Sequence, residues 1–150
     1  MQSCPSAHTM DENGNAEEER NMVETIKVQA GEGAFALEAV AVAMPRGITV
    51  TAYTPAYAHL GATAQAIPRP EHDRTATVSI LAVPCHRDEV PAHDIAAALA
   101  TKFRVPVAAS CGFHVEAAST DDIEHVLATT RDLIAALEDR IAQILPVPED

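Results

Sequence analysis

Apolar positions in the first half of the chain recur mostly at every second residue, which is the period of a β-strand. Residues 48–53 alternate strictly, with Ile48, Val50 and Ala52 on one face and threonine or tyrosine between them. Similar runs predict further strands over residues 24–29, 35–44, 61–67 and 75–83. Short turns with glycine or proline separate several of these runs, which favours antiparallel pairing.

The second half of the chain changes to a helical period. Ile95, Ala98 and Leu99 recur at that spacing and predict a helix over residues 91–102. An apolar run over residues 104–110 predicts one more strand. Strands followed by helix, strand and helix predict an α+β fold, in which an antiparallel sheet of five to six strands carries two helices packed on it.

The last of these elements is a long helix over residues 119–145. Ser119 or Thr120 suits its N-cap, and acidic residues follow in its first turn, where the helix dipole favours anions. We expect Leu127, Leu137 and Ile141 to face the sheet. They belong to an apolar stripe formed by Ile123, Val126, Leu127, Leu133, Ile134, Leu137, Ile141 and Ile144.

The ends of the chain differ from its centre. Residues 1–21 are polar, acidic and nearly free of large apolar side chains, so we predict a disordered acidic tail. Residues 22–146 are predicted to form a single α+β domain, and residues 147–150 a frayed C-terminus.

Composition narrows the function classes. The net charge of −12 argues against nucleic acid as a partner, because phosphate binding needs a concentrated basic surface. No apolar run approaches the roughly 20 residues of a membrane helix, and we expect no signal peptide. Aromatic residues make up only 3%, so the core must consist of Ala, Val, Ile and Leu. Cys4, Cys85 and Cys111 show no paired spacing, which favours a reducing cytoplasm.

Three short segments each place a histidine at the end of a predicted strand: residues 59–62 (HLGA), 85–88 (CHRD) and 112–116 (GFHVE). Loops at strand ends commonly hold ligands, and histidine changes charge near neutral pH. Glycine lets a ligand approach the backbone, and arginine suits a phosphate or carboxylate. We therefore predict one binding site. Its candidate residues are His59, Gly61, Cys85, His86, Arg87, Gly112, His114 and Glu116.

A metal site is an alternative use of the same residues. His59, His86 and His114 would be its nitrogen ligands, and Glu116 or Asp88 its oxygen ligand. Their spacing does not match a paired-ligand motif such as HExxH.

Nucleophilic catalysis is a second alternative. It would pair Cys85 with His86, or Cys111 with His114, although adjacent residues on a strand point apart. Neither GxGxxG nor GxxxxGK[ST] occurs, so a Rossmann or P-loop nucleotide site is not indicated.

The three segments resemble the prenylated-flavin chaperone family, typified by the small D subunit of gallate decarboxylase systems. That family has a His-hydrophobic-Gly-Ala element, a Gly-His-basic-acidic element and a Gly-hydrophobic-His-x-Asp-Asn element, in this order. Residues 59–62 match the first. Residues 85–88 match the second, with Cys85 in place of Gly. Residues 112–117 match the third, with Glu116 and Ala117 in place of Asp and Asn.

The resemblance implies a non-catalytic protein that binds prenylated FMN or FMN. It would receive the cofactor from a flavin prenyltransferase and deliver it to a UbiD-type aromatic acid decarboxylase. It also implies a fold similar to proteasome assembly chaperones, and a homodimer. The alanine-rich segment 34–43 offers a flat surface for a protein partner.

Two other function classes remain open from the residues themselves. One is a cofactor-free assembly chaperone or protein-interaction module. The other is a small enzyme that uses the histidines as acid and base or as metal ligands. Near-UV and visible absorption after coexpression with a flavin prenyltransferase distinguishes a carrier from both.

Overall fold

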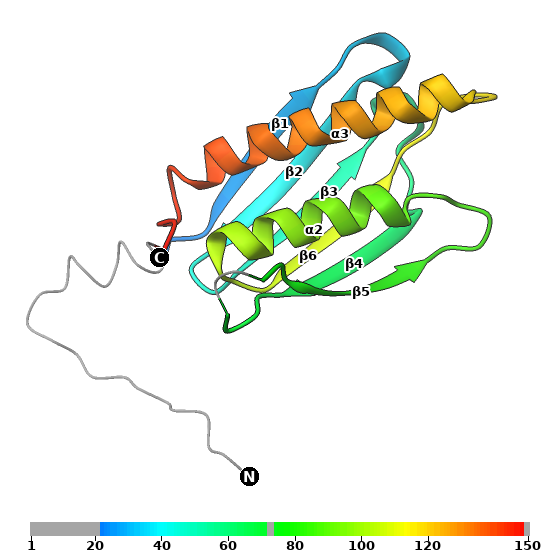
Figure 1. The fold of residues 1–150 in the computed structure, drawn as a ribbon. Helices are drawn as coiled ribbons and strands as arrows, with labels where there is room; N and C mark the ends of the chain where they lie inside the picture. Colours follow the sequence, from blue (N-terminus) through cyan, green and yellow to red (C-terminus); the bar gives the residue numbers. More distant parts are fainter. Residues whose placement is uncertain (1–21, 72–73, 149–150) are drawn as a thin grey trace, which may run out of the picture.

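The fold is a six-stranded sheet with two helices, seen in a computed structural model that describes residues 22–71 and 74–148 (Figure 1). The expected acidic tail, residues 1–21, lies outside the described residues. The strands are β1 (Glu24–Ala30), β2 (Leu37–Met44), β3 (Gly47–Tyr53), β4 (Ala62–Ile67), β5 (Thr77–Ala82) and β6 (Val107–Gly112). The helices are α2 (Glu89–Phe103) and α3 (Thr120–Ile141), with short 3-10 turns η2 (Gly33–Phe35) and η3 (Pro55–Tyr57).

The sheet has the strand order β1-β2-β3-β6-β4-β5. All neighbouring pairs are antiparallel except β3 and β6, which run parallel. The predicted α+β architecture is confirmed, with the parallel pair as one difference. The difference arises because β6 follows the crossover helix α2 and enters the sheet between β3 and β4. Turn lengths predict how consecutive strands pair, and they carry no information about such an insertion.

This insertion brings several chain ends to one edge of the sheet. Tyr53 at the end of β3 lies beside Gly112 at the end of β6. Ala62 at the start of β4 lies between Cys111 of β6 and Ala82 at the end of β5. The loops that follow β3, β5 and β6 therefore begin close together, and each carries one of the predicted histidine segments.

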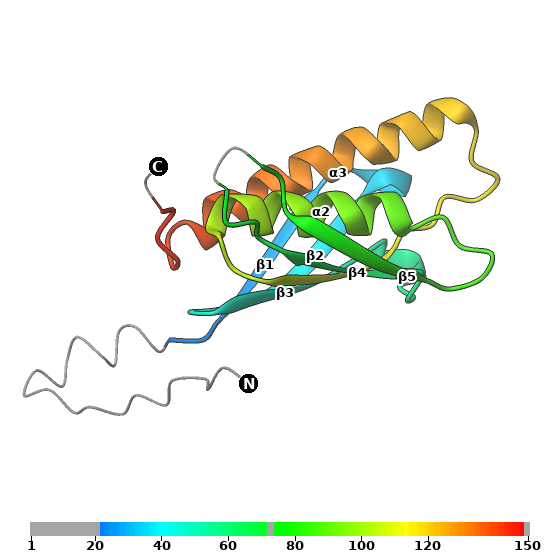
Figure 2. The ribbon, with the colours of Figure 1, turned by 60° about the horizontal axis from the view of Figure 1, so that its bottom comes forward.

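Both helices cover the same face of the sheet and leave the opposite face open (Figures 1 and 2). The covered face is built mainly from small side chains, which let the helices approach the backbone closely. Its buried alanines are Ala39, Ala41, Ala43, Ala52, Ala62, Ala64, Ala66 and Ala109. The expectation that the alanine-rich segment 34–43 presents a flat partner surface is therefore wrong for these alanines in β2. Val40 and Val42, which alternate with them, lie on the open face.

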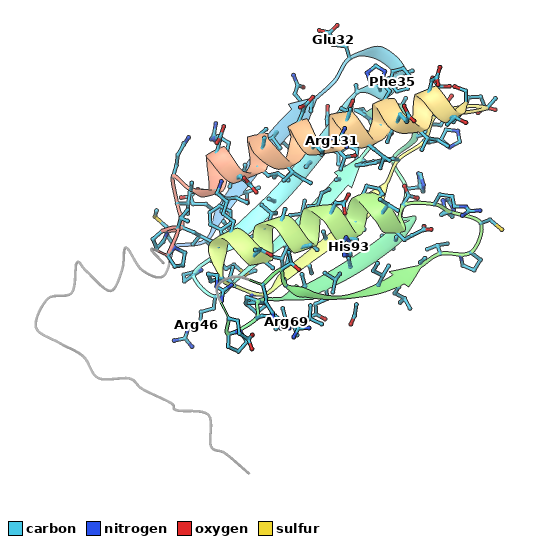
Figure 3. All side chains as sticks on the ribbon, viewed as in Figure 1. Glu32, Phe35, Arg46, Arg69, His93 and Arg131 are labelled. Atoms are coloured by element: carbon cyan, nitrogen blue, oxygen red, sulfur yellow. The ribbon has the colours of Figure 1, made fainter. Side chains whose placement is uncertain are left out.

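The long helix α3 packs through the second half of its predicted stripe. Leu133, Leu137 and Ile141 are fully buried, as the period requires. Leu127 is only half-buried, and Ile123 is 53% exposed. The prediction that Leu127 faces the sheet like Leu137 is thus not met, because the first turns of α3 line a cavity. At this same end of α3, Phe35 of η2 stacks on His125, with ring centroids 4.1 Å apart; Phe35 is labelled in Figure 3.

The start of α3 is fixed by a capping box. The Ser119 hydroxyl accepts a hydrogen bond from the Asp122 backbone N–H, and the Asp122 carboxylate accepts one from the Ser119 backbone N–H. Hydrogen bonds from Ser119 lower the pKa of the Asp122 carboxyl. The helix thus begins at the residue that the sequence predicted, close to the loop that carries His114.

The predicted strand over residues 75–83 is observed as β5, although it is an exposed edge strand. Ile80 is 43% exposed and Leu81 is 80% exposed. Within the described ranges, neither helix has the length and apolar character that crossing a membrane requires.

Replacing Leu137 by alanine should lower the free energy of unfolding by about 2–5 kcal/mol, because its side chain is fully buried between α3 and the sheet. Leu81→Ala is the matched control, and its effect should stay within about 0.5 kcal/mol because Leu81 is exposed. Urea denaturation of both variants measures the difference. Equal losses would contradict the packing described for α3.

Candidate functional site

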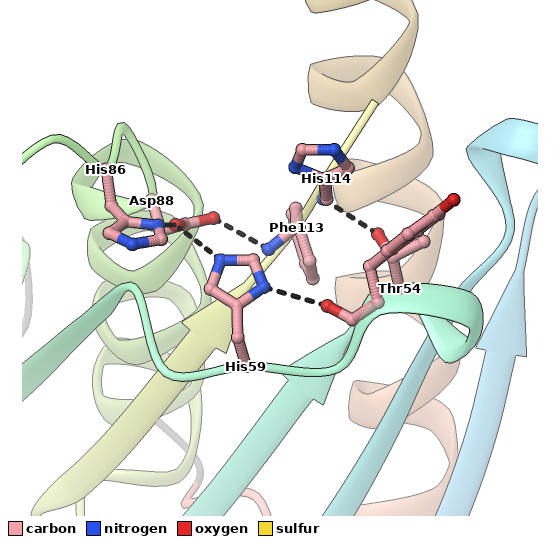
Figure 4. A network of polar contacts seen from close by, with 7 residues as sticks. Thr54, His59, His86, Asp88, Phe113 and His114 are labelled. Carbon is pink, nitrogen blue, oxygen red and sulfur yellow. Dashed lines mark hydrogen bonds and ion pairs between the residues drawn. The ribbon is translucent and has the colours of Figure 1, made fainter. Parts of the chain in front are cut away.

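The three predicted histidines meet at one edge of the sheet (Figure 4). His59 lies between η3 and β4, His86 between β5 and α2, and His114 between β6 and α3. The ring centroids of His59 and His86 are 4.8 Å apart, and those of His59 and His114 are 6.5 Å apart. Segments separated by up to 55 positions in the chain thus form one cluster, because the strands next to them end at the same edge of the sheet.

The carboxylate of Asp88 connects the segments, and it is only 4% exposed. Its Oδ1 accepts a hydrogen bond from the backbone N–H of Phe113 at 2.7 Å. Its Oδ2 lies 3.5 Å from Nε2 of His59 and 3.6 Å from Nδ1 of His86 (Figure 4). A buried carboxylate is costly unless polar partners surround it, so Asp88 constrains all three loops.

Two residues that follow β3 complete the framework. Thr54 donates its backbone N–H to the carbonyl of Gly112, and its hydroxyl oxygen accepts from the backbone N–H of His114 at 3.0 Å. The carbonyl of Tyr57 lies 2.8 Å from Nδ1 of His59. A carbonyl oxygen only accepts, so Nδ1 of His59 carries the proton in this bond. The ring of His59 is therefore held in one tautomer when it is neutral.

The two glycines of the site are required by close packing within the protein. A Cβ atom at Gly61 would overlap the carboxylate of Asp88, and one at Gly112 would overlap the backbone carbonyl of His59. We expected these glycines to give a ligand access to the backbone. In the structure the space beside them holds Asp88 and His59 instead, which explains the need for glycine without a ligand.

Two residues of the histidine-bearing loops adopt the left-handed backbone conformation that favours glycine and asparagine. Cys85 has φ +70° and Ala117 has φ +49°. They are two of the positions where the resemblance described above implies other residues, Gly at 85 and Asn at 117. The departures therefore place an unfavourable backbone conformation on both sides of the site.

A cavity of about 630 Å³ opens beside the cluster. Four of the predicted site residues line it, namely Cys85, His86, Arg87 and His114, and Asp88 lines it as well. The cavity lining does not include the other four, which are His59, Gly61, Gly112 and Glu116. Glu116 is exposed and lies 3.2 Å from Nε2 of His114. The other lining side chains are mostly apolar, namely Val90, Pro91, Phe113, Val115, Ala118, Ile123, Val126 and Leu127.

The start of α2 forms the polar end of the cavity. Asp88 is the N-cap residue, yet its carboxylate makes no capping hydrogen bond because it contacts Phe113 and the histidines. The backbone N–H groups of Glu89 and Val90 have no acceptor among the described residues. Uncapped N–H groups at a helix start favour anions, and the exposed Arg87 adds a positive charge beside them.

One feature opposes a purely anionic ligand at this end. Oε2 of Glu89 is buried with no hydrogen-bond partner among the described residues. A ligand in the cavity would need a donor group near Glu89 as well as an acceptor near Arg87. The site thus offers an acceptor, Glu89, to a donor group of the ligand, and a donor, Arg87, to an acceptor group.

Cysteine chemistry is disfavoured at this site. Burial raises the pKa of the Cys111 thiol well above its usual value, and the negative charge of Asp88 raises it further. Cys111 is therefore a protonated core residue at neutral pH, whereas a nucleophile must be a thiolate. Cys85 is exposed in its strained turn and lines the cavity.

The sequence-based residue set missed several groups that organise the site. Thr54 acts through contacts with the distant residues Gly112 and His114, and Tyr57 acts through its backbone carbonyl, so the sequence offers no signal for either. Asp88 belongs to one of the three segments, so its position next to His86 and Arg87 is the feature of the sequence that could have indicated its role. The apolar wall from α3 was assigned to the core because it continues the same helical stripe.

Comparisons with known proteins agree with the fold. Residues 31–142 of the 150-residue chain match the family described as the prenylated flavin chaperone LpdD-like domain. No curated protein matches the chain. The chain is also similar to a structure from yeast, a chaperone complex for 20S proteasome assembly. The TM-score is 0.57 at 15% identity, over 79% of this chain and 98% of that one, which shows a shared fold.

Replacing Ala117 or Cys85 by glycine should raise the free energy of unfolding by up to about 1 kcal/mol, because glycine adopts positive φ without a steric penalty. Ala58→Gly is the control, since Ala58 has φ −60° and should lose stability instead. Thermal and urea unfolding measure both effects. A loss of stability in both site variants would contradict the strain assigned to these positions.

Proposed function

Because the chain belongs to the prenylated-flavin chaperone family, we propose that it binds prenylated FMN, or FMN, in the cavity beside the histidine cluster. In this proposal the protein is a carrier that delivers the cofactor to a UbiD-type aromatic acid decarboxylase. The observation that carries the proposal is the division of the cavity. Apolar side chains of α3 and of the loop before it line one part of the cavity, and Arg87, His86 and the start of α2 line another.

The size and chemistry of the cavity suit a flavin mononucleotide. Sites for ligands of this class usually have volumes of about 300–1,000 Å³, and this cavity has about 630 Å³. The dimethylbenzene end of the isoalloxazine and the prenyl-derived ring are apolar, so they match the wall formed by Phe113, Ile123 and Leu127. These apolar groups are partly exposed, and ligand binding would remove them from water.

The phosphate would lie at the start of α2. Arg87 can form paired charge-assisted hydrogen bonds with phosphate oxygens, and the free N–H groups of Glu89 and Val90 add donors. The carboxylate of Asp88 does not oppose this placement strongly, because it contacts His59, His86 and the Phe113 amide. His86 and His114 line the same cavity and add donors when protonated.

A carrier must also release its ligand and contact other proteins. The proposed partners are the flavin prenyltransferase that makes the cofactor and the decarboxylase that uses it. We place a second copy of the chain against the open face of the sheet, where Val40 and Val42 are half-buried and Ile67 is 55% exposed. We propose the reducing cytoplasm as its compartment, in keeping with the free thiols of Cys85 and Cys111.

Replacing Arg87 by alanine should weaken flavin binding about ten- to a hundredfold, because the phosphate loses a charged hydrogen-bond donor worth about 1.5–3 kcal/mol. The measurement is a fluorescence titration with FMN and with prenylated FMN, followed by activation of a cofactor-free decarboxylase. Arg46→Ala is the matched control. Arg46 is exposed in the turn between β2 and β3, away from the cavity-lining segments, so its loss should leave binding unchanged (Figure 3).

Two results would count against this proposal in different ways. If the wild-type protein binds neither flavin at micromolar concentration, the carrier function fails, and a cofactor-free assembly chaperone takes its place. If the Arg87 and Arg46 variants bind equally well, the placement of the phosphate is wrong.

A further inference from the structure

The histidine cluster contains a nitrogen atom whose surroundings the protein alone does not explain. Nε2 of His59 is buried and has no hydrogen-bond partner among the described residues. The atoms nearest to it in the cluster belong to Asp88 and His86. The separation of 3.5 Å between this nitrogen and Oδ2 of Asp88 is too long for a good hydrogen bond. A flavin in the cavity would not supply the partner, since His59 does not line the cavity.

The tautomer of His59 places a lone pair on Nε2 when the ring is neutral. Nδ1 donates to the carbonyl of Tyr57, so in the neutral ring Nε2 carries a lone pair. That lone pair is close to Oδ2 of Asp88, which is also an electron-pair donor. Two such atoms repel each other unless a cation lies between them. Either a proton on His59 or a metal ion satisfies this requirement.

The positions of the donor atoms favour a metal ion. Nε2 of His59, Nδ1 of His86 and Oδ2 of Asp88 all lie within 4.8 Å of one another. Asp88 Oδ2 is 3.5 Å and 3.6 Å from the two nitrogens. A tetrahedral ion with bonds of about 2.0–2.2 Å requires its ligand atoms to be about 3.3–3.6 Å apart. Two of the three separations therefore already match such an ion.

We propose that His59, His86 and Asp88 bind a divalent transition-metal ion such as Zn²⁺. Two imidazoles and one carboxylate are a typical donor set for this class of ion. His114 is outside the group, and its Nε2 contacts Glu116. This differs from the metal site considered from sequence, which used all three histidines. Three protein ligands leave one coordination position for water or an anionic oxygen.

The surroundings of the ligands are arranged as in known metal sites. Metal-binding histidines usually donate their second nitrogen to a carbonyl or carboxylate, as His59 does to Tyr57. The second oxygen of Asp88 is held by the Phe113 amide, which leaves Oδ2 for the ion. Gly61 has no side chain, and this lets the Asp88 carboxylate reach its position. His59 and Asp88 are therefore held in position before an ion arrives.

The test is a titration of the full-length, chelator-treated protein with Co²⁺ and without flavin, followed by Zn²⁺ competition. One equivalent of Co²⁺ should give the visible absorption of a tetrahedral site, and Zn²⁺ should abolish it. His86→Ala and Asp88→Asn should each weaken binding by more than about a hundredfold, since even loss of a supporting group costs about 10–100-fold. His86 is exposed, so its variant should fold normally.

His93→Ala is the matched control, because His93 forms an exposed pair with Asp94 at 2.9 Å on α2 (Figure 3). This variant should bind Co²⁺ like the wild type. The proposal is overturned if the wild type binds no ion at micromolar concentration. Nitrogen NMR that shows His59 doubly protonated would then identify a proton as the cation between His59 and Asp88. The proposal is also overturned if His86→Ala binds as tightly as the His93 variant. Neither result depends on flavin binding.

Discussion

The buried carboxylate of Asp88 is the constraint on which the site depends. It lies at the start of α2, and it reaches the backbone of Phe113 in the loop after β6 and the ring of His59 before β4. A buried carboxylate without such partners would cost several kcal/mol. The loops are therefore not independent, and their relative positions follow from the need to solvate one negative charge. Gly61 and Gly112 serve the same packing, because any larger residue there would displace Asp88 or His59.

The sheet provides the geometry that makes this possible. Insertion of β6 between β3 and β4 places the ends of β3, β5 and β6 at the same edge. Both helices cover one face, and α3 extends its first apolar residues along the cavity beside this edge. The same helix thus supplies core residues such as Leu137 and cavity residues such as Ile123. One amphipathic stripe thus contributes to both the core and the cavity wall, and its periodicity in the sequence does not show which residues do which.

Much of this arrangement was predictable from the sequence, for identifiable reasons. Alternation and helical spacing located the strands and both helices, because burial on one face determines which positions must be apolar. The three histidine segments were predictable as one site because each follows or precedes a strand. The parallel pairing of β6, the contacts of Thr54 and the central position of Asp88 were not predictable. They depend on contacts between segments far apart in the chain, which no local pattern records. The left-handed conformations of Cys85 and Ala117 became visible only when their dihedral angles were known.

Asp88 holds the β6–α3 loop in place through the Phe113 amide. Hydrogen exchange of that amide tests this role of Asp88 most directly, in the wild type and in Asp88→Ala, because Asp88 is its acceptor. Exchange should be about tenfold faster or more in the variant, since a hydrogen bond to a charged group is worth about 1.5–3 kcal/mol. Amides in the β1–β2 hairpin should keep their protection. Unchanged protection of the Phe113 amide in a folded variant would show that Asp88 does not hold this loop.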